Sequence, residues 1–241
     1  MKTGKQGANA LNALIMGMGI GIGLIVLAGC GGQQEQPVEE FRPPPTRTRV
    51  PPTPLPTVAV LPTPDCNGAF FPETGHTVCQ PFLRFWEANG GLPIFGYPIT
   101  DLIQERNAET GETYKAQYFE RARFELHANT GDTVVLGRLG ALVGRSEPPA
   151  ALLPGAQFFA ETGHNLSGPF LRFWNEHGGL PIFGYPITEE IKEKNPSDGK
   201  EYTVQYFERA RFELHPDQAG TPFEVQLGQL GTQLYNKTYR K

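Results

Sequence analysis

Hydrophobic and polar positions recur along this chain at a constant spacing of 88 residues. Residues 71–127 and 159–215 share 38 identical positions among 57 aligned ones. Within this match, residues 90–100 return unchanged as residues 178–188, with three Gly and two Pro in each copy. Gly reaches positive φ and Pro fixes φ, so both residues at constant positions specify backbone turns. The pattern predicts two tandem copies of one small unit.

The first part of each copy has a helical period. Phe82, Phe85 and Trp86 fall at i, i+3 and i+4, which predicts a short helix over residues 81–89 with one buried stripe. A Pro at its first helical position and the Gly pair after it are typical of a helix start and end. After the Gly/Pro stretch, Thr100 is expected to cap a brief second helix over residues 101–106, with Thr188 in the same role in the second copy.

The next part of each copy predicts a β-hairpin, with strands over residues 114–120 and 123–127. A two-residue loop would place Phe119 opposite Phe124 on one face and Glu120 opposite Arg123 on the other. Arg-Ala is poor chemistry for such a tight turn, so a longer loop is the alternative. A final apolar run, residues 134–143 and 225–234, is expected to cap the repeat.

These elements predict an α+β fold made of two tandem homologous modules, each with short helices and a β-hairpin. The expected boundaries are residues 66–146 and 155–241, with the join around residues 147–154. One module of about 80 residues would be marginally stable alone, whereas two copies can share a core.

Residues 1–29 predict a bacterial lipoprotein signal peptide. Lys2 and Lys5 precede a mostly apolar run over residues 11–28, which ends in Leu-Ala-Gly before Cys30. Cys30 would then become the new N-terminus and carry the lipid that anchors the protein to the membrane. An uncleaved anchor and an ordinary signal peptide are the alternatives. Each of them places the rest of the chain outside the cytoplasm.

Residues 30–65 are expected to form a Pro/Thr-rich linker. They have no hydrophobic period, and Pro-rich sequence of this kind favours extended polyproline II, so the linker would act as a stalk. Docking to a Pro-binding module is an alternative, and whether the threonines carry sugars stays open.

If Cys30 carries lipid, Cys66 and Cys79 remain as a pair in an oxidising compartment, which predicts a disulfide. Ser167 stands at the position of Cys79 in the second copy, so the disulfide is not required by the repeat itself. Two thiols without clustered His do not suggest a metal site, and no cofactor is expected.

The Gly-Tyr-Pro core resembles the LGFP-type repeats of bacterial cell-envelope proteins. The matching residues are the motifs at residues 95–98 and 183–186, the hairpin residues Phe119 and Phe207, and the closing residues Gly137 and Gly228. The chain departs from this pattern at residues 121–123 and in its additional front helix. It is also similar to duplicated Phe-Arg-Phe-Trp…Phe-Gly-Tyr-Pro modules on secreted bacterial proteins, often appended to hydrolases. The resemblance implies association with the envelope, with wall glycan as one candidate ligand, and does not imply an enzyme.

Charged residues that occur in both copies raise the question of catalysis. They are Glu73/Glu161, His76/His164, Arg84/Arg172, Glu120/Glu208, Arg121/Arg209, Arg123/Arg211, Glu125/Glu213 and His127/His215. A Glu and His set invites an acid–base glycan hydrolase, but two intact copies of one active site would be unusual, and no known nucleophile, metalloprotease or phosphate-loop motif is present. Zinc held by His76 and His127 would need a third ligand that the sequence does not offer.

Binding is therefore the leading hypothesis, with a non-catalytic, lipid-anchored protein contacting cell-wall polysaccharide. The candidate ligand-binding residues are Tyr97, Tyr185, Arg84, Arg172, His76 and His164. A tyrosine ring in the Gly/Pro loop could stack on a sugar, although such rings often fill a small core instead. A hydrolase using the repeated Glu and His, and an accessory protein that binds another envelope protein, are the alternatives. The net charge of −4 with mixed signs argues against nucleic acid.

Overall fold

The fold is α+β, as the sequence predicts. The computed structural model describes residues 59–60, 66–106, 111–143, 145–195 and 198–240, which all belong to one compact unit, Pro52–Lys241. The expected signal peptide, Cys30 and nearly all of the Pro-rich linker lie outside the described residues. The predicted module boundaries stay predictions.

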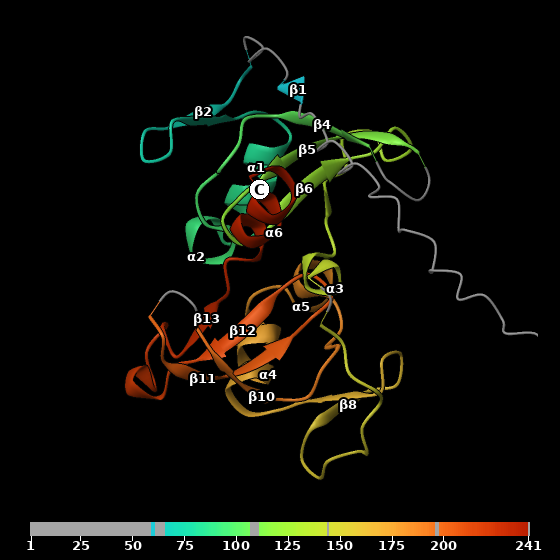
Figure 1. Cartoon of the computed structure of the whole chain (residues 1–241), viewed down its shortest axis with the longest axis vertical. Coiled ribbons are helices and arrows are strands. Elements are labelled where there is room, and N and C mark those ends of the chain that lie inside the picture. The colour runs from blue at the N-terminus through green and yellow to red at the C-terminus, as the bar shows by residue number, and fades with distance from the viewer. Residues whose placement is uncertain (1–58, 61–65, 107–110, 144, 196–197, 241) are drawn as a thin grey trace, which may run out of the picture. The chain divides into compact units, whose positions relative to one another are not determined.

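Apart from one additional 3-10 helix in the second copy, the same order of described elements occurs twice along the chain (Figure 1). The first copy contains β2 (Ala69–Phe71), β3 (His76–Val78), α1 (Phe82–Ala88), α2 (Gly91–Phe95), β4 (Ile103–Arg106), β5 (Thr113–Tyr118), β6 (Arg123–Leu126), β7 (Val135–Leu136) and α3 (Leu139–Leu142). The second contains β8 (Gln157–Phe159), β9 (His164–Leu166), α4 (Gly168–Glu176), α5 (Gly179–Phe183), β10 (Ile191–Lys194), β11 (Glu201–Tyr206), β12 (Arg211–Leu214), the 3-10 turn η1 (Pro216–Gln218), β13 (Val225–Leu227) and α6 (Leu230–Tyr239).

Each copy has one main antiparallel sheet and one small hairpin. The second sheet has the order β10-β11-β12-β13. The first has the order β1-β4-β5-β6-β7, because β1 (Ala59–Val60) adds a strand at the edge of β4. The small hairpins are β2-β3 and β8-β9.

The predicted front helix is confirmed as α1 and α4, and it ends where Gly90 and Gly178 take left-handed backbone with φ of 100° and 103°. An L-residue with a side chain adopts this conformation only with strain, which explains the repeated Gly. The following Gly/Pro stretch is not an irregular loop throughout, since it forms the single-turn helices α2 and α5.

The predicted helix over residues 101–106 is wrong. Residues Ile103–Arg106 form strand β4, with Ile103 and Glu105 buried and the two residues between and after them exposed. Thr100 does not cap a helix, because its hydroxyl oxygen accepts the Tyr118 amide at 3.1 Å. Pairing with β5 thus outweighs the local signal for a helix.

The main hairpin is confirmed, but the register that follows from a two-residue loop is wrong. Gln117 lies opposite Phe124, and Tyr118 lies opposite Arg123. Residues 119–122 form a longer loop, which the Phe119 amide closes by donating to the Ala122 carbonyl oxygen at 2.8 Å. The alternative of a longer loop is therefore the one that the structure bears out.

Aromatic side chains fill the core of both copies. Phe124 makes edge-to-face contacts with Phe82, Phe85 and Phe95, at ring-centroid distances of 5.8, 5.1 and 4.8 Å. Phe212 occupies the same position in the second copy, and one continuous apolar cluster includes both rings. The buried stripe expected for the front helix is confirmed, because Phe82 lies in this cluster and Phe85 and Trp86 pack against it.

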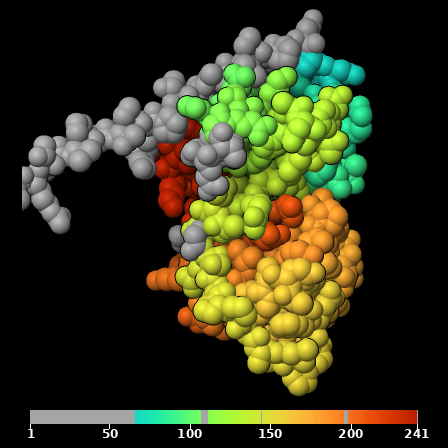
Figure 2. Space-filling view, turned by 90° about the vertical axis from the view of Figure 1, so that its right-hand side faces the viewer, coloured from blue at the N-terminus to red at the C-terminus, as the bar shows by residue number. Residues whose placement is uncertain are grey.

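The last helix of each copy packs on the sheet of the other copy. Leu139 of α3 joins an apolar cluster with Val204 and Tyr206 of β11. Tyr235 and Tyr239 of α6 pack against Ile103 and Tyr118 of the first sheet. Figure 2 shows the red C-terminal residues against the green first copy. The final apolar run therefore caps the neighbouring repeat, which the sequence did not indicate.

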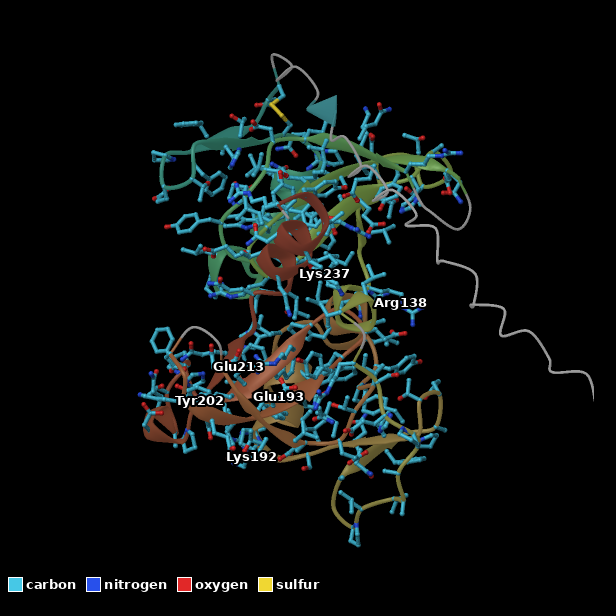
Figure 3. The ribbon with its side chains drawn as sticks, in the orientation of Figure 1. Arg138, Lys192, Glu193, Tyr202, Glu213 and Lys237 are labelled. Carbon is cyan, nitrogen blue, oxygen red and sulfur yellow. A yellow bond between two sulfur atoms is a disulfide. The ribbon has the colours of Figure 1, made fainter. Side chains whose placement is uncertain are left out.

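The predicted disulfide between Cys66 and Cys79 is confirmed, with Cα atoms 5.5 Å apart (Figure 3). It ties the segment before β2 to the end of β3. The second copy holds the same segment by hydrogen bonds instead, because Asn165 accepts the Leu153 amide at 2.9 Å and donates to the Ala151 carbonyl oxygen at 2.9 Å.

Removal of the disulfide by the double substitution Cys66→Ser/Cys79→Ser is expected to lower the free energy of unfolding by about 3 kcal/mol, through loop-closure entropy. Urea denaturation with and without reductant measures this difference. Reductant should have no effect on the double variant. Equal stability of the oxidised and reduced wild-type chain would contradict a stabilising role.

Candidate functional site

The candidate tyrosines each belong to a partly exposed aromatic cluster. Phe71 makes edge-to-face contacts with Trp86 and Tyr97, at centroid distances of 5.3 and 6.3 Å. The indole nitrogen of Trp86 donates to the Gly96 carbonyl oxygen at 3.1 Å, which holds the ring beside the Gly-Tyr-Pro turn. Phe159, Trp174 and Tyr185 repeat this arrangement in the second copy, with distances of 5.4 and 5.7 Å.

A carboxylate accompanies each tyrosine hydroxyl. The pKa of Tyr97 is raised, first by loss of solvent and then by the neighbouring Glu73 carboxylate. The pKa of Tyr185 is raised in the same way, with Glu161 as the carboxylate. Both pairs combine an aromatic face with hydrogen-bonding groups, which is the chemistry that a sugar ring requires.

A second carboxylate positions the backbone of each tyrosine. Glu120 Oε2 accepts the Tyr97 amide at 3.2 Å, and Glu208 Oε2 accepts the Tyr185 amide at 3.3 Å. Glu120 and Glu208 therefore act within the fold and hold the Gly-Tyr-Pro turn against the loop of the main hairpin.

The candidate arginines do not join the aromatic clusters. Arg84 is exposed on α1, and Arg172 on α4 forms an ion pair with Glu224 at 3.3 Å. Within the described ranges, no hydrogen bond or ion pair connects either arginine with Tyr97 or Tyr185. The proposed polar contact from these arginines is thus without structural support.

The candidate histidines have different surroundings in the two copies. His76 Nδ1 lies 3.5 Å from Asp101 Oδ2, and its side chain is 29% exposed. His164 is buried, with Nδ1 at 3.2 Å from Glu189 Oε1 and Nε2 at 3.2 Å from the Glu147 carbonyl oxygen. The histidine at this position of the repeat is therefore covered in the second copy and partly accessible in the first.

An open groove of about 230 Å³ lies next to His76. Its lining residues are Thr74, His76, Ile99, Thr232, Tyr235, Asn236 and Arg240. Three of them come from the first copy and four from α6 or its C-terminal end. Sequence analysis missed this groove, because no local pattern showed that α6 packs on the other repeat.

A buried polar cluster lies under α6 in the first copy. Glu105 accepts hydrogen bonds from the Tyr114 and Tyr118 hydroxyls at 2.9 and 2.8 Å and from the Tyr239 hydroxyl, and it forms an ion pair with Arg123 at 3.2 Å. Burial raises the pKa of Tyr118 well above its ordinary value, an effect that Arg123 partly opposes. The cluster is closed by mutual contacts, so it stabilises the fold and offers no free acid or base.

The second copy has a related, less buried cluster. Glu193 accepts the Tyr206 hydroxyl at 3.0 Å and pairs with Arg211 and Arg145 at 3.1 and 3.3 Å. Burial raises the pKa of Tyr206 to about 12. Figure 3 labels Glu193 and Glu213 among the side chains of this copy. Arg145 here supplies a contact where the first copy uses Tyr239.

The described residues contain neither a metal-binding cluster nor a membrane-spanning helix. No group of three or more His, Cys, Asp or Glu in this part of the chain could hold a metal ion. No helix among residues 59–240, within the ranges given above, is long and apolar enough to cross a membrane.

Comparison of the chain with protein-family models, with curated proteins and with solved structures gives no significant match. The resemblance to LGFP-type repeats therefore stays a prediction from the residues.

Proposed function

We propose that this protein is a non-catalytic, lipid-anchored extracytoplasmic protein that contacts cell-wall polysaccharide through its two repeats. The observation that carries the proposal is the duplicated aromatic cluster, in which Tyr97 and Tyr185 each stand beside a carboxylate and remain partly exposed. Two equivalent sites on one chain would raise the avidity for a repeating polymer without any tighter single site.

The contacts of the repeated charged residues within the fold favour a binding function over hydrolysis. Arg121 donates to the Leu92 and Leu227 carbonyl oxygens at 2.9 and 3.2 Å. Glu125 pairs with Arg123 at 2.6 Å and with His127 at 2.8 Å. These groups are engaged in contacts that hold the fold together, whereas a general acid or base must reach a substrate.

Co-sedimentation of the detergent-solubilised full chain with isolated wall glycan tests this proposal. The chain should pellet with the glycan, and Tyr97→Ala/Tyr185→Ala should reduce the bound fraction at least about 10-fold, because the stacking of a tyrosine ring on a sugar is lost at both sites. Tyr97→Phe/Tyr185→Phe keeps the rings and should retain most of the binding.

Thermal unfolding of both double variants provides the control for folding. Pelleting that persists in a folded Tyr→Ala double variant would move the site away from the aromatic clusters. Release of soluble sugar by the wild-type chain would contradict the non-catalytic proposal and favour the hydrolase. Failure to pellet would favour the accessory protein that binds an envelope protein.

A further inference from the structure

The groove beside His76 has a filled counterpart in the second copy. There, the segment that joins the two repeats passes over His164 and covers it. The Glu147 amide donates to the Ile187 carbonyl oxygen at 3.0 Å, and the Ala150 amide donates to the Gly163 carbonyl oxygen at 2.8 Å. The second copy thus shows how a Glu-Pro-Pro-Ala segment, residues 147–150, binds to this surface.

Side-chain contacts secure the same segment. The Glu147 carboxylate accepts the Glu189 amide at 3.2 Å, and the Glu147 carbonyl oxygen lies 3.2 Å from His164 Nε2. Pro149 packs so closely on Gly163 that a Cβ there would come within 2.5 Å of the proline ring. An acidic side chain and a proline are therefore the features that this surface recognises.

The first copy keeps the matching groups but leaves them uncovered. Ile99 and Gly75 correspond to Ile187 and Gly163, and among the described residues no hydrogen bond reaches their carbonyl oxygens. Ile99 is partly exposed where Ile187 is buried. No atom of the described residues would lie within 4 Å of a Cβ on Gly75.

The histidine of the first copy keeps its carboxylate partner but lacks the contact that the joining segment makes in the second. His76 Nδ1 lies 3.5 Å from Asp101 Oδ2, as His164 Nδ1 lies 3.2 Å from Glu189 Oε1. His76 Nε2 corresponds to the His164 atom beside the Glu147 carbonyl oxygen, and it has no hydrogen-bond partner among the described residues. The Asp101 amide, which corresponds to the donor that holds the Glu147 carboxylate, has no acceptor among the same residues. These two groups are the ones that a ligand in the groove would contact.

The preceding segment of the first copy takes a different path. Ala59 and Val60, which correspond by the 88-residue offset to Glu147 and Pro148, pair with Gln104 and Ile103 at the edge of β4. The Cys66 disulfide then holds the chain that leads into β2. Among the described residues before β2, none makes the contacts that the joining segment makes in the second copy.

We propose that this groove binds an extended segment of a partner protein in which an acidic residue is followed by two prolines. The backbone amides of the segment donate to the Ile99 and Gly75 carbonyl oxygens, and its carboxylate accepts the Asp101 amide. Arg240 at the rim adds a favourable charge for an acidic ligand. Extended proline-containing peptides lose little conformational entropy on binding, which suits a shallow groove. The site uses different residues from the wall-binding proposal and does not depend on it.

The internal segment supplies the probe. A fluorescently labelled hexapeptide with the sequence of residues 146–151, Ser-Glu-Pro-Pro-Ala-Ala, is titrated with the detergent-solubilised full chain, and the anisotropy is recorded. We expect saturable binding. The same peptide with Lys in place of Glu should bind about 10-fold more weakly, because the charge-assisted hydrogen bond to the amide is lost.

Two substitutions on α6 locate the site. Asn236 is exposed and lines the groove, so Asn236→Trp should obstruct it and lower the affinity at least about 10-fold. Lys237→Trp is the matched control, because Lys237 is exposed on the same helix and does not line the groove (Figure 3). Absence of saturable binding to the wild-type chain, or equal affinity of the Asn236→Trp variant and the wild-type chain, would overturn the proposal.

Discussion

Gly231→Ala is expected to lower the free energy of unfolding by about 3 kcal/mol. Gly231 lies in the first turn of α6, and a Cβ there would come within 1.9 Å of the Phe119 carbonyl oxygen and 2.9 Å of that of Ala122. These atoms belong to the backbone of the hairpin loop, so they cannot move aside as a flexible side chain could. The helix must therefore shift away from the loop. This shift breaks the hydrogen bond that the Thr232 amide donates to the Glu120 carbonyl oxygen at 3.1 Å.

The sign of this effect distinguishes tertiary packing from helix propensity. In an isolated helix, Ala is favoured over Gly by about 1 kcal/mol, so propensity alone predicts a more stable variant. Urea denaturation of the wild-type chain and of Gly231→Ala decides between the two expectations. Gln233→Ala, at an exposed position of the same helix, is the control and should change stability by less than about 0.5 kcal/mol.

Gly140→Ala should behave in the same way, because its Cβ would come within 1.9 Å of the Phe207 carbonyl oxygen. The equivalence of Gly140 and Gly231 follows from the reciprocal packing of α3 and α6. A variant of either glycine that is as stable as the wild-type chain would contradict that packing.

Glu105→Ala is expected to lower the free energy of unfolding by about 3–5 kcal/mol. The substitution leaves the hydroxyls of Tyr114, Tyr118 and Tyr239 without their acceptor, and it leaves Arg123 with Glu125 as its only carboxylate partner among the described residues. Removal of one member of a buried ionic cluster is costly, because the remaining groups stay desolvated without compensation.

Glu193→Ala is the matched comparison in the second copy. Its side chain is 18% exposed, against 6% for that of Glu105, and among the described residues Tyr206 is the one tyrosine whose hydroxyl is hydrogen-bonded to it. Its loss should cost about 1–2 kcal/mol. Tyr239→Phe removes one hydroxyl and should show how much of the Glu105 effect comes from α6. Equal losses for Glu105→Ala and Glu193→Ala would contradict the larger contribution expected from the more buried first cluster.

Local patterns in the sequence were sufficient for several elements. The spacing of Phe82, Phe85 and Trp86 predicts α1, because apolar residues at i, i+3 and i+4 lie on one face of a helix, which can then be buried. The repeated Gly90 predicts a turn, because few residues other than Gly adopt its positive φ without strain. The disulfide follows from an even pair of cysteines in an oxidising compartment.

Other predictions were wrong where pairing between distant strands determines the local structure. Residues 101–106 carry a helix-start signal, but β4 forms because β5 offers a partner strand. The register of the main hairpin depends on a four-residue loop that the Gly-Tyr-Pro turn contacts, through the Glu120 amide and the Tyr97 carbonyl oxygen at 2.9 Å. Contacts of this kind join residues that are far apart in the sequence, so a local pattern does not contain them.

The sequence by itself determined the duplication, the α+β composition of each copy, the core aromatic residues and the cysteine pair. Only the tertiary structure decided which sheet the last helix of each copy covers. It also decided that His164 is covered by the joining segment, whereas His76 borders an open groove. The runs around Leu139 and Leu230 carry the same Leu-Gly-x-Leu-Gly pattern, so their local preferences are the same in both copies. The difference arises after these runs. The run around Leu139 continues into the joining segment, which covers His164, whereas the run around Leu230 continues as α6 and leaves His76 open.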